Sequence, residues 1–319
     1  MSIKRCKRNF QKESITRKFI FITVLSCLGL LLISCDSKLK NETTEIIETE
    51  TTLIEETEPP VIYEPVWSEE KIYLDMNLPY ATYSVINNGF AVLYKQDERY
   101  VNYKNKTIAV NAGHGTKDGS KVKTYSHPDF TPKVTGGSTT KGATMSSAVS
   151  VGMVFDDGTT EAENNLKVAE RLRDKLLDDG YSVLMIRTTD DVRLDNVART
   201  VIANNYADAH ISIHFDVTNS DKGIFYIAPY GDRKYLNMEP LKDNADNIRN
   251  LGRAIISSFA DMGEKIWKKG ELQLDLTQIS YSTNPSVDVE LGDRKTVITD
   301  EKIDIFAEGI KRGIEKFFS

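Results

Sequence analysis

The stretch that decides the fold is Ile108-Ala109-Val110-Asn111-Ala112-Gly113-His114-Gly115. Its first three residues are a short apolar run, and the two glycines around His114 end that run in a turn. The pattern predicts a buried strand that leads directly into a polar, glycine-flanked turn. In open α/β sheets ligands bind at the carboxyl ends of the strands, so we expect His114 to stand at a functional edge.

Strand-like and helix-like segments alternate along the chain that follows. The expected strands are short and apolar, and the expected helices have apolar residues at helical spacing. The strands are predicted at 181–186, 209–214, 223–228 and 287–290, and the helices at 163–179, 194–205, 244–262 and 302–318. This alternation predicts an α/β fold, in which helices flank both faces of a single mixed, mostly parallel sheet.

Residues 66–106 are expected to form a short β lead-in to the domain at 107–319. Tyr80 to Ile86 and Phe90 to Tyr94 are strand-like. The tripeptide Asn87-Asn88-Gly89 between them is a hairpin signal. We therefore predict a hairpin ahead of the main domain.

The first 34 residues have the pattern of an export signal. Seven basic side chains and one acid in residues 1–18 precede 16 uncharged residues, Phe19 to Ser34. This run is shorter than the ~20 residues of a spanning helix and is typical of a signal-peptide core. Leu32-Ile33-Ser34-Cys35 resembles a bacterial lipoprotein cleavage box, which implies a diacylglycerol on the sulfur of Cys35. An uncleaved N-terminal anchor is the alternative, and either one puts the rest of the chain outside the cytoplasmic membrane.

Residues 35–65 are expected to be an acidic Thr/Glu/Pro tether. Nine acids against two lysines, three prolines and few apolar residues favour an extended chain without a core. No cysteine follows Cys35, which excludes a disulfide framework and a cysteine metal site from the folded domain. The net charge of −6 also argues against a nucleic-acid-binding protein.

Four residues are expected near one edge of the predicted sheet. His114, His214 and Glu290 each end a strand, and Glu161 begins a helix. Two imidazoles and one carboxylate suit zinc and leave a position for water, while a second carboxylate could move protons. No short motif joins these residues, so a structural interpretation stays open. In it, His114 is a polar turn residue, His214 a strand-end histidine, and Glu161 a first-turn acid favoured by the helix dipole.

Several separated motifs resemble, in one order, the zinc-dependent N-acetylmuramoyl-L-alanine amidases, the amidase-3 family of cell-wall hydrolases. The opening stretch at 108–115 looks like theirs, and residues 161–166 resemble Glu-Lys-Asp-x-Asn-Leu. Residues 186–190 resemble Thr-Arg-x-x-Asp with Ile186 in place of Thr, and Arg199, Ala203 and Asn204 match a helix motif. Residues 207–214 resemble Ala-Asp-x-Phe-Ile-Ser-Ile-His, and residues 285–292 resemble Pro-x-x-Leu-x-Glu-x-Gly.

The resemblance covers about 107–319 and implies both chemistry and roles. It implies Zn²⁺ held by His114, Glu161 and His214, with Glu290 as the catalytic residue. Glu290 would take a proton from zinc-activated water and return it to the leaving amine. The bond cut would join N-acetylmuramic acid to L-alanine in peptidoglycan. His210, which replaces the motif's aromatic residue, would be structural.

Besides the single substitutions at Ile186 and His210, the chain departs from the family pattern in two places. The ligand candidates His114 and Glu161 are 47 residues apart, far more than is usual, and residues 116–160 between them form a Gly/Ser/Thr-rich insert. After Gly292 the chain reads Asp293-Arg294-Lys295 instead of an aromatic and a Ser/Thr-Asn pair. The insert makes Glu163 a competitor of Glu161 as the carboxylate ligand, and Asp156 and Asp157 are weaker competitors. The insert also contains His127, which is expected to be a loop residue and not a ligand.

Several questions of function stay open at the level of sequence. The insert is expected to shape or cover the cleft, or else to be a spacer, and the helix at 244–262 could occlude the site. Two other functions are compatible with the same residues. One is a catalytically inactive, lipid-anchored wall-binding module, and the other is a zinc peptidase acting on the stem peptide. An activator protein is a further expected partner of unknown identity.

Overall fold

The computed structural model describes residues 60–319 of the chain. The predicted signal peptide, Cys35 and the tether up to residue 59 lie outside these residues. Among the described residues, no helix combines the length and the apolar character needed to cross a membrane.

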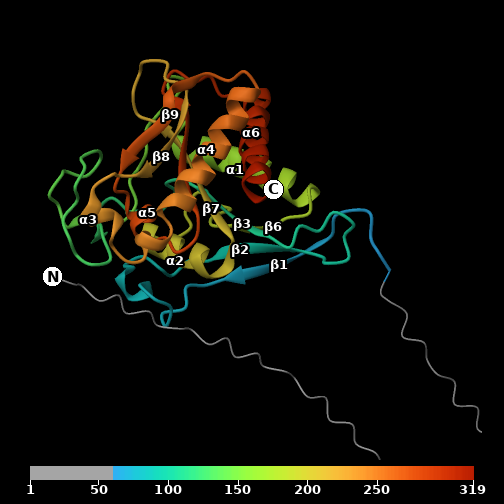
Figure 1. Ribbon diagram of the computed structural model, residues 1–319, viewed down its shortest axis with the longest axis horizontal. Coiled ribbons are helices and arrows are strands. Elements are labelled where there is room, and N and C mark those ends of the chain that lie inside the picture. The colour runs from blue at the N-terminus through green and yellow to red at the C-terminus, as the bar shows by residue number, and fades with distance from the viewer. Residues whose placement is uncertain (1–59) are drawn as a thin grey trace, which may run out of the picture. The chain divides into compact units, whose positions relative to one another are not determined.

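The core of the structure is one eight-stranded sheet with the order β1-β2-β6-β3-β7-β10-β8-β9 (Figure 1). The pairings β3–β6, β3–β7, β7–β10 and β8–β9 are parallel, and the other three are antiparallel. The prediction of a mixed, mostly parallel sheet is therefore confirmed. The strands are β1 Trp67–Ile72, β2 Ala91–Gln96, β3 Thr107–Ala112, β6 Ser182–Met185, β7 Ala209–Asp216, β8 Ile224–Pro229, β9 Ile266–Leu274 and β10 Ser286–Asp293.

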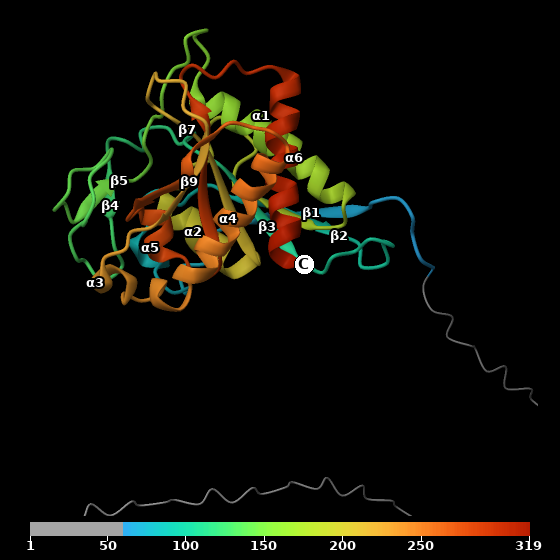
Figure 2. The ribbon, with the colours of Figure 1, turned by 45° about the horizontal axis from the view of Figure 1, so that its top comes forward.

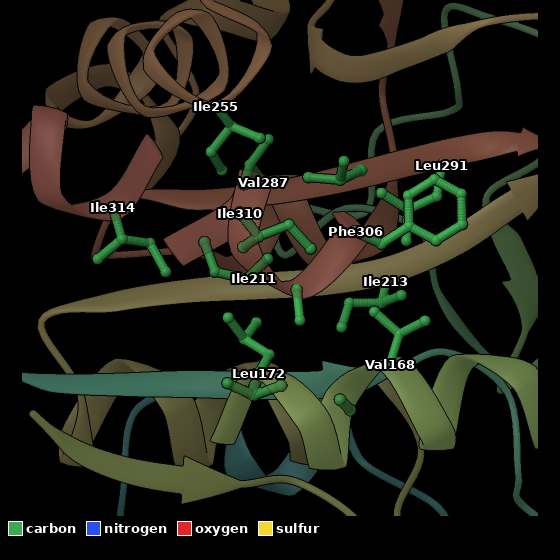
Figure 3. Packing of buried hydrophobic residues seen from close by; sticks show 14 of the residues in the cluster. Val168, Leu172, Ile211, Ile213, Ile255, Val287, Leu291, Phe306, Ile310 and Ile314 are labelled. Atoms are coloured by element: carbon green, nitrogen blue, oxygen red, sulfur yellow. The ribbon is translucent and has the colours of Figure 1, made fainter. Parts of the chain in front are cut away.

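Helices cover both faces of the sheet because its central strands are apolar on both. On β3, Ile108 and Val110 face a core shared with α1 (Glu161–Asp178), α4 (Ala245–Asp261) and α6 (Asp300–Phe318). Ala109 faces the other way, toward α2 (Asn196–Tyr206). Figure 2 shows α1, α4 and α6 together on one side, and Figure 3 shows their side chains packed on β7 and β10. The shorter helices are η1 Ala81–Tyr83, α3 Arg233–Leu236, η2 Leu241–Asp243 and α5 Thr277–Tyr281.

The lead-in differs from its prediction. Residues 81–83 form the short helix η1, and β2 pairs with β1 instead of with a strand at 80–86. Asn87-Asn88-Gly89 makes no hairpin turn, because Gly89 passes directly against the backbone of Val192, where a Cβ would meet a carbonyl oxygen. Asp195, the N-cap of α2, accepts hydrogen bonds from the Val85 and Ile86 amides. The glycine thus serves a close approach between segments, and the hairpin prediction is wrong.

Three further features were not predicted or were predicted otherwise. The edge strand β9 was missed, as was the small ribbon of β4 (Lys123–Tyr125) and β5 (Met145–Ser147) within the insert. Helix α4 packs against β8, β10 and α6. It supplies none of the residues that line the cleft described below, so it belongs to the helical layer and does not occlude the site.

Candidate active site

Three neighbouring strands carry candidate residues to one edge of the sheet. His114 lies in the turn after β3, and β3 is paired with β7, which carries His214. In the parallel pairing of β7 with β10, His214 is the register partner of Glu290. Glu161 is the first residue of α1, whose N-terminus reaches the same edge. Parallel strands end at a common edge, and this arrangement gathers residues from four distant parts of the chain.

His114, Glu161 and His214 converge on one point. The Nε2 atom of His114 lies 2.8 Å from Oε1 of Glu161, and Nδ1 of His214 lies 3.0 Å from the same oxygen. The two ring nitrogens are 3.1 Å apart. Within residues 60–319, no other group of three such side chains brings one ligand atom each within 4.8 Å of one another. We call these three residues the triad.

The donor set of the triad fits a divalent cation. Two imidazole nitrogens and one carboxylate oxygen are the ligands that a catalytic zinc site uses, with a fourth position left for water. Burial alone would raise the pKa of Glu161, but the contacts with His114 and His214 outweigh it and hold that pKa well below its ordinary value. Burial acts to lower the pKa of His214, yet Asp288 and Glu161 together raise it to about 10. The site therefore attracts positive charge, either as protons or as a metal ion.

The turn that carries His114 is held in a strained shape. His114 has φ +64°, in the left-handed region that only a few non-glycine residues adopt. Gly113 beside it has no room for a side chain, because a Cβ would lie 2.2 Å from Cε1 of His214. The guanidinium of Arg199 donates to the His114 carbonyl at 2.6 Å, and Arg187 donates to that of Gly113 at 3.1 Å.

Arg187 and Arg199 are buried and hold backbone carbonyls instead of carboxylates. Arg187 also donates to the carbonyls of Ala112 and Ala162, which joins the His114 turn to the start of α1. Burial lowers the pKa of Arg187 to about 10 and that of Arg199 to about 9, so both stay charged at neutral pH. Sequence reasoning missed this role, although both residues stood in the matched motifs.

Glu290 lies beside the triad in a setting suited to proton transfer. Burial, with the neighbouring charge of Asp288, raises the pKa of Glu290 well above its ordinary value. Its Oε2 atom is buried and, within the described part of the chain, has no hydrogen-bond partner. A carboxyl with a raised pKa holds a proton more readily than an ordinary one, which suits a group that passes a proton from one reactant to another.

Asp288 is a site residue that sequence reasoning missed. It precedes Glu290 by two positions on β10, so both side chains face the cleft. Its Oδ2 atom lies 3.9 Å from Nε2 of His214. The signal was available, because Asp288 stands where the family pattern Pro-x-x-Leu-x-Glu-x-Gly has leucine.

The competing residues lie away from the triad. Glu163 forms the capping box of α1 with Thr160, and Asp157 accepts from Thr159 in an exposed turn, next to the exposed Asp156. His210 is buried in the sheet, where it contacts Ser286. His127 is a loop residue as predicted, but a buried one. Glu161 is thus the carboxylate that meets the two histidines.

The insert forms one wall of a cleft of about 650 Å³ whose floor is the triad and Glu290. Residues 136–139, 146, 147 and 149–153 line that wall, and an apolar wall faces it, built from Phe225, Ile227, Leu272, Leu274 and Leu276. The insert is fixed by Asp275, which is fully buried and pairs with Lys133 at 2.7 Å and His127 at 3.2 Å. Asp275 also accepts from the Val134 amide and the Thr135 hydroxyl. The insert thus lines the cleft, as the first of its two expected roles requires.

Comparison with known proteins agrees with this arrangement. Residues 108–316 match the family described as N-acetylmuramoyl-L-alanine amidase. The chain is similar to the solved N-acetylmuramyl-L-alanine amidase Ami1 from Mycobacterium smegmatis, with 21% identity and a TM-score of 0.54 over 67% of this chain and 97% of that one. The chain is also similar to the Ami1 structure from Mycobacterium abscessus, with 22% identity and a TM-score of 0.51 over 67% of this chain and 99% of that one. At such identities the structures support the fold alone, and the curated proteins give no match.

Proposed function

Because the chain belongs to the N-acetylmuramoyl-L-alanine amidase family of peptidoglycan-cleaving hydrolases, we propose that it acts with a zinc ion bound by His114, Glu161 and His214. The observation that carries the proposal is the convergence of three candidate ligand atoms beside Glu290, which is partly buried and whose Oε2 atom is fully buried. The bond cut is the amide between N-acetylmuramic acid and L-alanine. This amide is unreactive, so a Lewis acid and a proton shuttle are both needed.

When bound, zinc would polarise the amide carbonyl and make water a stronger nucleophile near neutral pH. The protein's own residues supply the rest. Glu290 accepts the proton of the attacking water and then donates a proton to the departing amine of L-alanine. Its raised pKa favours the first step, because the carboxyl then holds the proton taken from water until the amine departs. The buried arginines keep the His114 turn in place during these steps.

The complete donor set and Glu290 favour a catalyst over an inactive wall-binding module. The alternative of a zinc peptidase would use the same chemistry on another bond of the stem peptide. Mass spectrometry of peptidoglycan digested by the purified protein separates the three. We expect new L-alanine amino termini; cuts inside the stem peptide would indicate the peptidase. A zinc-loaded protein that releases nothing, alone or with cell extract as a source of an activator, would indicate the binding module.

We also propose that the protein is extracytoplasmic and held at the bacterial membrane by a lipid on Cys35. Support comes from the basic segment, the 16 uncharged residues and the Leu-Ile-Ser-Cys box in the sequence. Residues 36–65, with their excess of acids and their prolines, would act as a spacer between the membrane and the catalytic domain. Cys35→Ala should release the protein from the membrane fraction, and unchanged membrane retention would contradict the lipid anchor.

A further inference from the structure

The insert segment 148–153 lies directly against two residues of the triad. The carbonyl oxygen of Ser150 is 2.9 Å from Nδ1 of His114. The Met153 amide donates to Oε2 of Glu161 at 3.0 Å, and the Glu161 amide donates back to the Met153 carbonyl at 2.9 Å. The first two of these contacts use the side-chain atom of each residue that faces away from the centre of the triad, Nδ1 of His114 and Oε2 of Glu161.

In a metal site, groups around the ligand residues bind the side-chain atoms that do not face the metal, and the same arrangement is found here. His114 presents Nε2 to the triad, so its other nitrogen must carry the proton, and the Ser150 carbonyl accepts it. Glu161 presents Oε1 to the triad, and Met153 holds Oε2. Such partners fix the tautomer and the orientation of a metal ligand, and their loss typically weakens metal binding.

Gly152 lies between these two contacts and is pressed against both side chains. A Cβ at this position would lie 2.7 Å from Cδ2 of His114 and 3.0 Å from Oε2 of Glu161. Its φ is +85°, in the left-handed region. Gly142 of the same insert has nearly the same φ, +88°, but a Cβ there would meet no atom within 4 Å. Gly152 therefore meets a constraint that comes from the two ligand side chains as well as from the backbone.

The segment is in turn fixed to the domain. The Asn196 amide at the start of α2 donates to the Ala148 carbonyl at 3.0 Å, and the Val149 amide donates to the Gly119 carbonyl at 3.1 Å. The segment 148–153 is thus held by α2 and by the first part of the insert. It does not depend on the ligands alone for its position.

From these contacts we infer that the insert segment 148–153 positions the metal ligands, with Gly152 as the positioning residue on which His114 and Glu161 rest. The inference rests on the proposed function, since it takes the triad to be the zinc site. It gives the insert a second role beside forming the cleft wall. The insert, which accounts for the long spacing between His114 and Glu161, then contributes part of the surroundings of the metal centre.

The test compares Gly152→Ala with Gly142→Ala in the full chain. Both variants place a side chain at a left-handed position of the insert, so both should lower the melting temperature of the zinc-free protein, and Gly152→Ala should lower it further because its Cβ also meets His114 and Glu161. Zinc affinity, measured by competition with a chelating indicator, should fall about 10- to 100-fold in Gly152→Ala only. Gly142→Ala should bind zinc like the wild type.

Equal zinc affinity of Gly152→Ala and wild type would overturn the inference while leaving the proposed function intact. An equal loss in both variants would overturn it as well, because the effect would then come from backbone strain. A wild-type protein that binds no zinc would refute the proposed function and the inference with it.

A second measurement needs no variant and covers the case in which Gly152→Ala fails to fold. Amide hydrogen exchange of the wild type, with and without zinc, should show slower exchange at 148–153 when zinc is added. Residues 136–142, in the same insert but without contact to the triad, should not change. Equal exchange at 148–153 in both conditions would contradict the inference.

Discussion

Two buried histidine–carboxylate clusters stand close to the same cleft but differ in how their charges are met. In the cluster that fixes the insert, Asp275, which follows β9, pairs with Lys133 and His127 and accepts hydrogen bonds from a backbone amide and a hydroxyl of the insert. Protein groups thus compensate its negative charge. In the triad, one carboxylate oxygen faces two ring nitrogens, and the acids Asp288 and Glu290 stand nearby. The first cluster is complete, whereas the second is short of positive charge. This difference distinguishes a structural contact from the proposed metal site more clearly than residue type does.

The largest expected effect comes from breaking the triad. His114→Ala removes one of three ligands, so we expect zinc content to fall to background and peptidoglycan cleavage to be lost. The fold should survive, because the apolar core lies under the triad and does not depend on it. Metal analysis and circular dichroism check both points. Full zinc retention by the variant would remove His114 from the site.

Glu290→Gln separates proton transfer from zinc binding within the proposed site. The amide cannot shuttle a proton, so kcat should fall by about 10²- to 10⁴-fold. Zinc content should stay at the wild-type level, since Glu290 is not a proposed ligand. Turnover of purified peptidoglycan and metal analysis on one preparation provide the measurement. A variant that loses zinc in parallel with activity would instead make Glu290 part of the donor set.

Asp275→Asn tests whether the cluster of Asp275 with Lys133 and His127 stabilises the fold. The buried ammonium of Lys133 then lacks its counter-charge, so the free energy of unfolding should fall by about 3 kcal/mol. Zinc affinity should change little, because Asp275 has no contact with the triad. Urea denaturation of the zinc-free protein measures the loss, with Asp118→Asn, an exposed partner of Lys121, as a control that should show no change. A large drop in zinc affinity without a stability change would reverse the roles of the two clusters.

The buried His210 has no carboxylate partner among residues 60–319 and should show the smallest effect. Burial, with the charge of Arg199, lowers its pKa from 6.5 to about 3. Below about pH 6.5 the unfolded chain binds a proton that the folded state refuses, so stability falls as pH falls. The expected loss between pH 7 and pH 5 is about 2 kcal/mol. His210→Phe should flatten this slope in thermal melts, and parallel slopes for variant and wild type would contradict the assignment.

Much of the fold was predictable because its signals are local. The apolar run at 108–110 and the turn after it, the amphipathic helices and the strand that ends at His214 each depend on a few adjacent residues. Strand β9 was missed because it lies at the edge of the sheet and carries Lys268, Lys269 and Glu271 among its apolar residues. The lead-in was misassigned because Gly89 serves a contact with Val192, about a hundred residues away.

The residues of the triad and Glu290 could be singled out from the sequence, but Asp288 and the surroundings of the candidate site could not. The family resemblance singled out the triad and Glu290, and the structure brings the triad together beside Glu290. The resemblance could not supply the contacts of Arg187 and Arg199 with backbone carbonyls, because a sequence pattern does not record which carbonyl a side chain reaches. The attachment of the insert through Asp275 joins residues more than 140 positions apart and leaves no local trace in the sequence.

The central claim is that the triad holds a zinc ion that makes Glu290 productive on peptidoglycan. Its most direct test is the digestion of purified peptidoglycan by the wild type as isolated, after treatment with a chelator, and after zinc is restored, followed by mass spectrometry. We predict that L-alanine amino termini appear, vanish with chelation and return with zinc. Undiminished cleavage by the metal-free protein, verified by metal analysis, would contradict the account.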